Sequence, residues 1–313
     1  MERLFELQGH RGARGLKPEN TLPAFEIALD VGVSTIETDI HLTRDGVPVL
    51  FHDAVVTTLL CERLSGSPAP RPTARPPVSR LTLAHMRGYR ARRNPDPERF
   101  PQQDPAVTPV ASAFAGRHGL DPFVPPTLAD LFRFAEAYAG DLGERAGKTP
   151  AQRAQARRVR FDLDVKRLPF RPDLIGDGYD GSGPARLEER VVQAVRAGDV
   201  VGRTTVRSFD HRCVRALRQL EPRLTAAVLV AEAAPVDPAA LARAAGAEIY
   251  CPRLEFLDPA QLHQLQGDGI RVVPWTVNDP RDWDCLIGWG VDGITTDYPD
   301  ELAVFLRAHG IAY

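Results

Sequence analysis

Short runs of β-branched and aliphatic residues alternate with amphipathic stretches over most of the chain. This alternation is typical of parallel βα units. Nine runs have the length and composition of strands, at residues 4–9, 34–40, 47–53, 159–165, 204–209, 224–230, 247–252, 271–277 and 291–297. Eight stretches have the periodicity of helices, at residues 21–32, 127–139, 187–199, 211–222, 237–247, 258–269, 280–290 and 301–310. Several of them end in glycine, as helix C-termini often do.

The second and third predicted strands are joined only by "HLTRDG". A parallel crossover needs a dozen or more residues, so these two strands must form an antiparallel hairpin. Asp45-Gly46 is a favoured two-residue turn, and centring the turn there makes paired positions sum to 91 and places Asp39 opposite His52. Eight strands remain for a parallel barrel. We therefore predict an α/β fold, a (β/α)8 TIM barrel with a small insertion after this hairpin.

Residues 54–125 interrupt the alternation, because they are crowded with proline and arginine, as in "SPAPRPTARPPVSR". A disordered linker would have this composition, but a long loop inside a compact domain is more often a functional cap. The segment "LTLAHMRGY" could form a short helix within it. We predict one catalytic domain over residues 1–313, with residues 54–125 as an ordered insertion or cap.

Composition excludes several classes of partner. The 39 basic and 41 acidic residues give a formal net charge of −2, so no overall field recruits nucleic acid or an anionic membrane. The four cysteines are far apart and indicate neither a zinc site nor a disulfide framework. No apolar run approaches the ~18 residues of a membrane span, and no signal peptide is visible. We expect a cytoplasmic protein, or a periplasmic one if a leader was removed, without stable membrane insertion and with a small-molecule partner.

Ionisable residues gather at the C-terminal ends of four predicted strands: His10 and Arg11, Glu37 and Asp39, His52 and Asp53, and Asp162, Asp164 and Lys166. Catalytic groups of α/β barrels sit at these ends. Strand alternation puts Glu37 and Asp39 on one face, and Asp164 on one face with Lys166. Burying unpaired carboxylates costs roughly several kcal/mol each, so a cation must lie among them if they point inward. Oxygen ligands favour Mg²⁺ or Ca²⁺ over zinc.

The two strand-end imidazoles, His10 and His52, suggest a general acid and a general base. Arg11 and Lys166 add fixed positive charge at the same level. Together with a divalent cation, these groups suit a phosphate diester, whose transition-state charge needs stabilising from several sides. Which histidine is the acid and which the base stays open. Five other histidines are interpreted as isolated hydrogen-bonding residues, namely His41, His85, His118, His211 and His263.

The run "GHRGARGLKPENTLPAFEIALDVGVSTIETDIHLTRDGVPVLFHD" resembles the signature of the glycerophosphodiester phosphodiesterases. Later segments agree, namely "FDLDVK", "RSFD", "PWTVND" and "GVDGITTDYPD". The resemblance implies a TIM barrel that cleaves glycerophosphodiesters, with a metal, to sn-glycerol 3-phosphate and an alcohol. It implies these roles: His10 and His52 as the acid/base pair; Glu37, Asp39 and Asp164 as metal ligands; Arg11 and Lys166 on the phosphate; Glu19 and Asn20 at the site.

One ligand position departs from the family pattern, because the family usually has Glu where this chain has Asp164. The shorter side chain leaves three options: the metal shifts, water bridges the gap, or Asp162 contributes. Trp275 either packs in the core or lines the pocket and stacks on the substrate.

Two rival functions remain. A lysophospholipase D would use similar chemistry on a substrate with one acyl chain, and an apolar groove from the insertion would favour it. A catalytically inactive barrel that serves as a binding protein is the second rival. The preferred alcohol, the choice between Mg²⁺ and Ca²⁺, and the oligomeric state are left open by the sequence.

Overall fold

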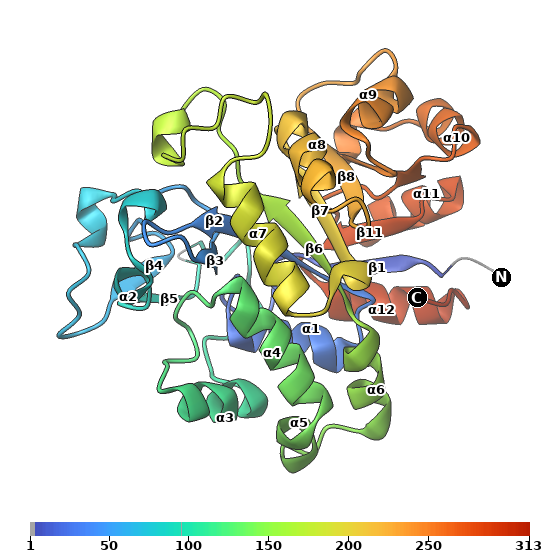
Figure 1. The fold of residues 1–313 in the computed structure, drawn as a ribbon. Helices are drawn as coiled ribbons and strands as arrows, with labels where there is room; N and C mark the ends of the chain where they lie inside the picture. The colour runs from blue at the N-terminus through green and yellow to red at the C-terminus, as the bar shows by residue number, and fades with distance from the viewer. Residues whose placement is uncertain (1–3, 95) are drawn as a thin grey trace.

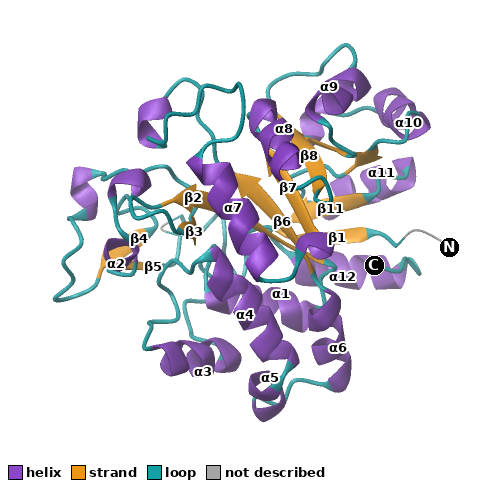
Figure 2. Ribbon diagram, in the orientation of Figure 1, coloured by secondary structure: helices purple, strands orange, loops and turns teal. Residues whose placement is uncertain are grey.

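The computed structural model describes residues 4–94 and 96–313. Eight parallel strands form a nearly closed barrel in the order β10-β9-β8-β7-β6-β2-β1-β11 (Figure 1). They are β1 Glu6–Gly9, β2 Thr35–Leu42, β6 Arg160–Val165, β7 Thr204–Ser208, β8 Thr225–Val230, β9 Ile249–Pro252, β10 Arg271–Val272 and β11 Gly293–Thr296. Helices surround the strands (Figure 2). The predicted TIM-barrel fold is confirmed.

The barrel closes between β10 and β11 without a regular ladder. Backbone hydrogen bonds run from Asp292 N to Val272 O, from Thr295 N to Pro274 O and from Val277 N to Thr295 O, each 3.0 Å long. Proline has no backbone N–H, so the chain after β10 cannot donate at that position. The seam is therefore held by scattered hydrogen bonds.

The predicted hairpin is present, but its predicted register is wrong by one. β3, Pro48–Leu50, pairs antiparallel with β2, and its partners sum to 90, as in Ile40 with Leu50. The loop has three residues instead of two, because Gly46 adopts a φ of 82° and adds a residue after the turn. As a result Asp39 lies opposite Phe51 instead of His52, and Phe51 N donates to Asp39 O at 3.1 Å.

All eight predicted helices occur, and they are α1 Leu22–Val31, α4 Leu128–Ala139, α7 Arg186–Ala197, α8 His211–Leu220, α9 Pro238–Ala245, α10 Pro259–Gly267, α11 Pro280–Trp289 and α12 Pro299–Ala308. The short helix suggested near residues 81–89 is α2, Leu83–Met86. Three helices were not predicted, namely α3 Pro109–His118, α5 Asp141–Arg145 and α6 Pro150–Arg158. Single 3-10 turns lie at Pro72–Ala74, Val78–Arg80, Pro172–Leu174, Val201–Arg203 and Leu254–Phe256.

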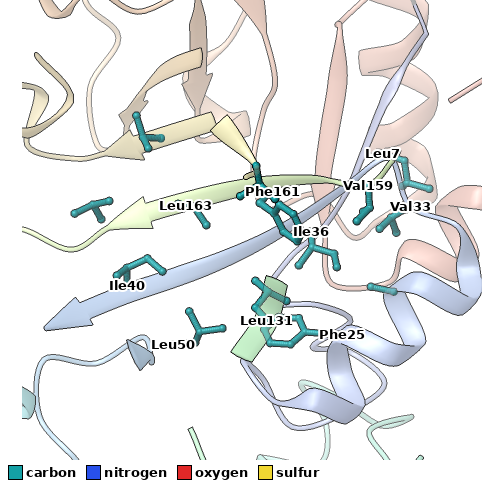
Figure 3. Close-up of a cluster of buried hydrophobic side chains, with 14 of the residues drawn as sticks. Leu7, Phe25, Val33, Ile36, Ile40, Leu50, Leu131, Val159, Phe161 and Leu163 are labelled. Atoms are coloured by element: carbon teal, nitrogen blue, oxygen red, sulfur yellow. The ribbon is translucent and has the colours of Figure 1, made fainter. Parts of the chain in front are cut away.

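The hydrophobic core lies between the barrel and its helices (Figure 3). In β2, Ile36 and Ile40 are fully buried, and Ile36 lies beside Phe25 of α1 and Leu131 of α4. Glu37 and Asp39 belong to the other face, because side chains alternate along a strand. Packing of the isoleucines against the helices therefore directs Glu37 and Asp39 into the barrel.

The barrel interior is divided into a polar and an apolar half. The apolar half is a separate cluster from β8, β9 and the chain after β10, made of Ala227, Leu229, Ile249, Cys251 and Val273. The interior-facing carboxylates come instead from β1, with Glu6, and from β2 and β6. The clustered carboxylates thus lie on the β2–β6 side of the barrel.

The chain between β3 and α4 carries a second small core. Its hairpin consists of β4, Cys61–Arg63, and β5, Tyr89–Ala91, and Figure 1 shows it beside α2 at one side of the barrel. Fully buried Met86 and Tyr89 belong to this core. The boundaries 54–125 for an insertion, and the single-domain division, stay predictions. Among the described residues no helix is long and apolar enough to cross a membrane.

Candidate active site

Three buried carboxylates meet at the C-terminal ends of β2 and β6. Glu37, Asp39 and Asp164 each offer an oxygen, and these oxygens lie within 4.8 Å of one another. The parallel register brings them together, since Asp39 pairs with Asp164 across the two strands. Strand alternation in the sequence predicted that Glu37 and Asp39 share a face, and the pairing of β2 with β6 adds Asp164 to them.

The positive groups around the cluster leave part of it unsatisfied. Lys166 Nζ bridges Asp39, at 2.8 Å, and Asp164, while Arg207 Nη2 lies 3.0 Å from Glu37. Burial raises the pKa of Glu37 to about 7, and the charges of Asp39 and Asp164 add to that effect. Asp164 Oδ1 is buried and accepts no hydrogen bond from any described residue. A free, buried carboxylate oxygen among acids of this kind fits an oxygen-ligated divalent cation.

Asp162 does not join this cluster. Its Oδ2 accepts hydrogen bonds from Gln8 Nε2 at 2.9 Å and Arg207 Nη1 at 3.0 Å, one layer deeper in the barrel. Burial raises its pKa to about 6, although Arg207 opposes this shift. Arg207 therefore links the deeper carboxylate to Glu37 and compensates both.

The loop after β1 supplies hydrogen-bond donors to the carboxylate cluster. Arg11 and Asn20 both have positive φ angles, 50° and 54°, which turn their side chains and amides toward the carboxylates. Arg11 N donates to Glu37 Oε2 at 2.9 Å, and Asn20 Nδ2 donates to Asp39 Oδ2 at 2.8 Å. Glu19 accepts from Arg11 Nη1 at 2.6 Å and makes no contact with the cluster oxygens that the structure records.

The loop can make this tight turn because of Gly9. A Cβ at that position would lie 2.2 Å from the carbonyl oxygen of Gly12. The chain therefore reverses immediately after β1 and delivers His10 to the rim.

His10 is held in one orientation by a buried carboxylate. Its Nδ1 lies 2.7 Å from Asp297 Oδ1, and its Nε2 lies 3.8 Å from Glu37 Oε2. Asp297 also accepts hydrogen bonds from Arg14 Nε and Arg14 Nη2, each at 2.8 Å, and from Asn278 Nδ2 at 2.9 Å. Burial and the charge of Arg14 lower the pKa of His10 to about 3. The ring is therefore neutral at physiological pH, with Nε2 facing the cluster.

His52 sits at the same rim and is more accessible, with 35 % of its side chain exposed. Its Nδ1 lies 2.7 Å from Asp53 Oδ1. His41 Nε2 donates to the backbone oxygen of His52 at 3.0 Å, and burial lowers the pKa of His41 to about 4. His41 is thus a neutral, structural hydrogen-bond donor, as the sequence suggested.

Trp275 makes no recorded contact with Glu37, Asp39 or Asp164. Its indole Nε1 donates to Cys251 O at 2.9 Å, and its ring meets Phe209 edge-on at 5.4 Å. It lines a cavity of about 280 Å³ together with Arg14, Asn278 and Asp297. Trp275 is thus anchored at its indole nitrogen and lines a cavity, and its stacking on the substrate stays a prediction.

Four residues of the site escaped sequence reasoning, and they are Arg14, Arg207, Asn278 and Asp297. Asp297 directly follows β11, so the strand-end rule could have singled it out. In the sequence, Arg207 looks like an ordinary strand residue. Only the pairing of β6 with β7 places it beside Asp164.

A family model for glycerophosphoryl diester phosphodiesterases matches residues 10–301. The chain belongs to this family. The family and the enzyme class expected from the sequence, a phosphoric diester hydrolase, are thereby confirmed.

Members of the glycerophosphoryl diester phosphodiesterase family are similar over nearly the full chain. A glycerophosphodiester phosphodiesterase from Caldanaerobacter subterraneus subsp. tengcongensis is 25% identical over 301 residues, covering 96% of this chain and 97% of the relative. A Silicibacter pomeroyi protein assigned to the same family superposes with a TM-score of 0.79 at 26% identity, covering 100% and 96%. An Oleispira antarctica phosphodiesterase in complex with the product sn-glycerol-3-phosphate shares the fold, with a TM-score of 0.63 at 18% identity over 96% and 97%.

Proposed function

We propose that the protein hydrolyses glycerophosphodiesters to sn-glycerol 3-phosphate and an alcohol, with a divalent cation and two histidines. The observation that carries this proposal is the meeting of Glu37, Asp39 and Asp164 within 4.8 Å, with His10 and His52 at the same rim. The product bound in the Oleispira antarctica structure supports this substrate class.

The cation would be held by Glu37, Asp39 and the free oxygen of Asp164, and Mg²⁺ or Ca²⁺ fits this donor set. When bound, such an ion polarises a phosphoryl oxygen and stabilises negative charge in the transition state. Asp164 is a ligand in this proposal despite its short side chain, because its oxygen lies with those of Glu37 and Asp39. Asp162 is not part of that group, and its Oδ2 is held by Gln8 and Arg207, although its Oδ1 also accepts no hydrogen bond from a described residue.

The surroundings of the two histidines give them different roles. His10 donates its Nδ1–H to Asp297, so its Nε2 carries a lone pair and accepts the proton of the attacking hydroxyl group or water. The charge of Asp297 is shared with Arg14. Asp53 makes its recorded ion pair with His52 alone and holds its Nδ1 at 2.7 Å, and in this proposal His52 donates a proton to the departing alcohol.

The fixed cations of the rim would hold the phosphate. Arg11 and Lys166 are anchored by carboxylates, and Lys166 keeps 13% of its side chain exposed. Glu19 fixes Arg11, Asn20 fixes Asp39, and Trp275 would stack on an organic part of the substrate. Each of these groups acts by position, which is how phosphoryl transfer is mainly catalysed.

A metal-screened assay tests the proposal. The purified protein, freed of metal with chelator, is given Mg²⁺ or Ca²⁺ and several glycerophosphodiesters, and release of sn-glycerol 3-phosphate is measured. We expect turnover only with cation, and a loss of about 10²-fold or more in His10→Ala and in His52→Ala. Near-wild-type turnover in both variants would sink the assignment. Failure to bind either cation by calorimetry, with the fold intact, would favour an inactive binding protein.

One observation keeps the lysophospholipase D rival in consideration. Leu168 and Phe170, which follow Lys166 at the rim, are 38% and 95% exposed. Such side chains could contact an acyl chain. Comparing glycerophosphocholine with lysophosphatidylcholine separates the two functions, and a higher kcat/KM for the acylated substrate would replace our proposal.

A cytoplasmic location also remains a prediction.

A further inference from the structure

Residues 99–104, between β5 and α3, are fastened onto the loop that carries His10. Gln103, itself buried, donates through Nε2 to Arg14 O at 2.6 Å and Lys17 O at 3.2 Å. Lys17 Nζ reaches Asp104 Oδ2 at 2.7 Å, and Asp104 N donates to Leu16 O at 2.9 Å. This segment is therefore bound to the mouth of the barrel by both its side chains and its backbone.

At the centre of this contact, Phe100 supports an arginine. Phe100 is only 2% exposed, and the guanidinium carbon of Arg14 lies 4.9 Å from the centre of its ring. The same guanidinium makes two 2.8 Å hydrogen bonds to Asp297. Asp297 in turn holds His10 Nδ1 at 2.7 Å. An unbroken series of contacts thus runs from the segment to the candidate general base.

The planar Arg14 group has to satisfy two partners at once. It can form the fork with Asp297 only in one plane, and the face of Phe100 fixes that plane by cation–π attraction and by filling the space behind it. If the guanidinium rotates, Asp297 loses two of its donors and no longer holds the imidazole in one orientation and tautomer. A misplacement of this kind is costly in catalysis, because the reacting nitrogen must be aimed closely.

We infer that Phe100 is a positioning residue for the His10–Asp297 pair, acting through Arg14, so that the segment before α3 is part of the catalytic apparatus. The inference rests on the proposed role of His10. Simple core packing is the competing explanation for a buried phenylalanine. The two explanations differ in what they predict for His10.

The chain contains a matched control for this test. Phe123 is also 2% exposed, and Arg90 lies over its ring at 5.1 Å and pairs with Asp121 at 3.5 Å. This second arrangement repeats the Phe–Arg–Asp order without reaching either histidine. Replacing each phenylalanine by leucine therefore removes an arginine–phenylalanine contact from two places, only one of which leads to His10. The Phe100 ring also carries Arg99, whose guanidinium carbon lies 5.3 Å from its centre, and Arg90 is more exposed than Arg14.

The experiment compares Phe100→Leu and Phe123→Leu with the wild type below their unfolding temperatures. We expect Phe100→Leu to lower kcat on a glycerophosphodiester about tenfold with less than about twofold change in KM, since a desolvated cation–π contact has roughly that worth. Phe100→Tyr, which keeps the aromatic face, restores most of kcat. Phe123→Leu keeps wild-type kcat.

A second measurement does not depend on turnover. Proton NMR follows the low-field ring-proton signal of the His10 Nδ1–H, identified by its loss in His10→Ala. Phe100→Leu shifts or broadens this signal, and Phe123→Leu does not. Equal losses of kcat in the two leucine variants, or an unchanged His10 signal in Phe100→Leu, would overturn the inference. Absence of any turnover in the wild type would count against the proposed function instead, while the NMR comparison would still decide the positioning role.

Discussion

Replacing Asp297 by asparagine tests how the site orients its general base. Asp297 Oδ1 accepts from His10 and Arg14 Nε, while Oδ2 accepts from Arg14 Nη2 and Asn278. His10 and Arg14 hold the pKa of Asp297 far below its usual range, although burial opposes this, so the carboxylate is charged at physiological pH. Whichever way the new amide turns, its NH₂ group faces two donors.

The size of the effect follows from these contacts. A hydrogen bond to a charged group contributes about 1.5–3 kcal/mol, so loss of the one that orients His10 lowers kcat by about 10- to 100-fold. The change also leaves Arg14, 8% exposed, without its buried partner. Breaking a buried ion pair in this way costs about 3–5 kcal/mol of unfolding free energy.

Two assays separate these effects. Urea unfolding gives the stability loss, and single-substrate kinetics below the unfolding range give kcat for Asp297→Asn, for His10→Ala and for the double variant. If Asp297 works through His10, the double variant is barely slower than His10→Ala alone. Fully additive losses of kcat would refute the idea that Asp297 acts on the histidine.

Three further outcomes are expected. Asp164→Asn should weaken Mg²⁺ or Ca²⁺ binding at least about tenfold by calorimetry, whereas Asp164→Glu, which restores the longer side chain, should bind within about tenfold of wild type; equal affinities would remove Asp164 from the ligand set. Thr127→Ala deletes the N-cap of α4, whose capping box the structure contains, and should cost about 1 kcal/mol in urea unfolding; an unshifted midpoint would contradict this. Burial raises the pKa of Asp177, but hydrogen bonds from Arg167 lower it overall, so its stabilisation is present above about pH 4 and is lost as pH falls further. Asp177→Asn should flatten that acid limb of stability, and a slope identical to wild type would argue against the pair.

The sequence predicted the parts of the site that depend on a single strand. Side chains alternate along β2, so the burial of Ile36 and Ile40 outside the barrel required Glu37 and Asp39 to point inside. The same reasoning applied to β6, where Asp164 and Lys166 share the inner face. These placements need only the period of a strand and the rule that barrel sites lie at strand ends.

The sequence pattern did not predict features that depend on contacts between different elements. The predicted hairpin register was wrong because the identities of Asp45 and Gly46 do not decide whether the loop has two or three residues. The backbone angle at Gly46 decides it. Helix α6 was missed because only Ala156 is buried in it, which leaves no apolar stripe to detect. Arg14 and Asp297 are far apart in sequence, and only the closed barrel brings the guanidinium group and the carboxylate together.

The irregular seam between β10 and β11 has a consequence for motion. Three separate backbone hydrogen bonds, supported by bonds to the side chains of Asp292 and Asn278, close the barrel there in place of the continuous ladder that joins β2 to β6. Local opening therefore needs fewer backbone bonds to break at the seam than between β2 and β6. Amide hydrogen exchange should therefore be faster at Val277 and Thr295 than at Leu163. Because Asn278 and Asp297 border this seam, brief opening would release the support of His10 while the β2–β6 carboxylates stay in place.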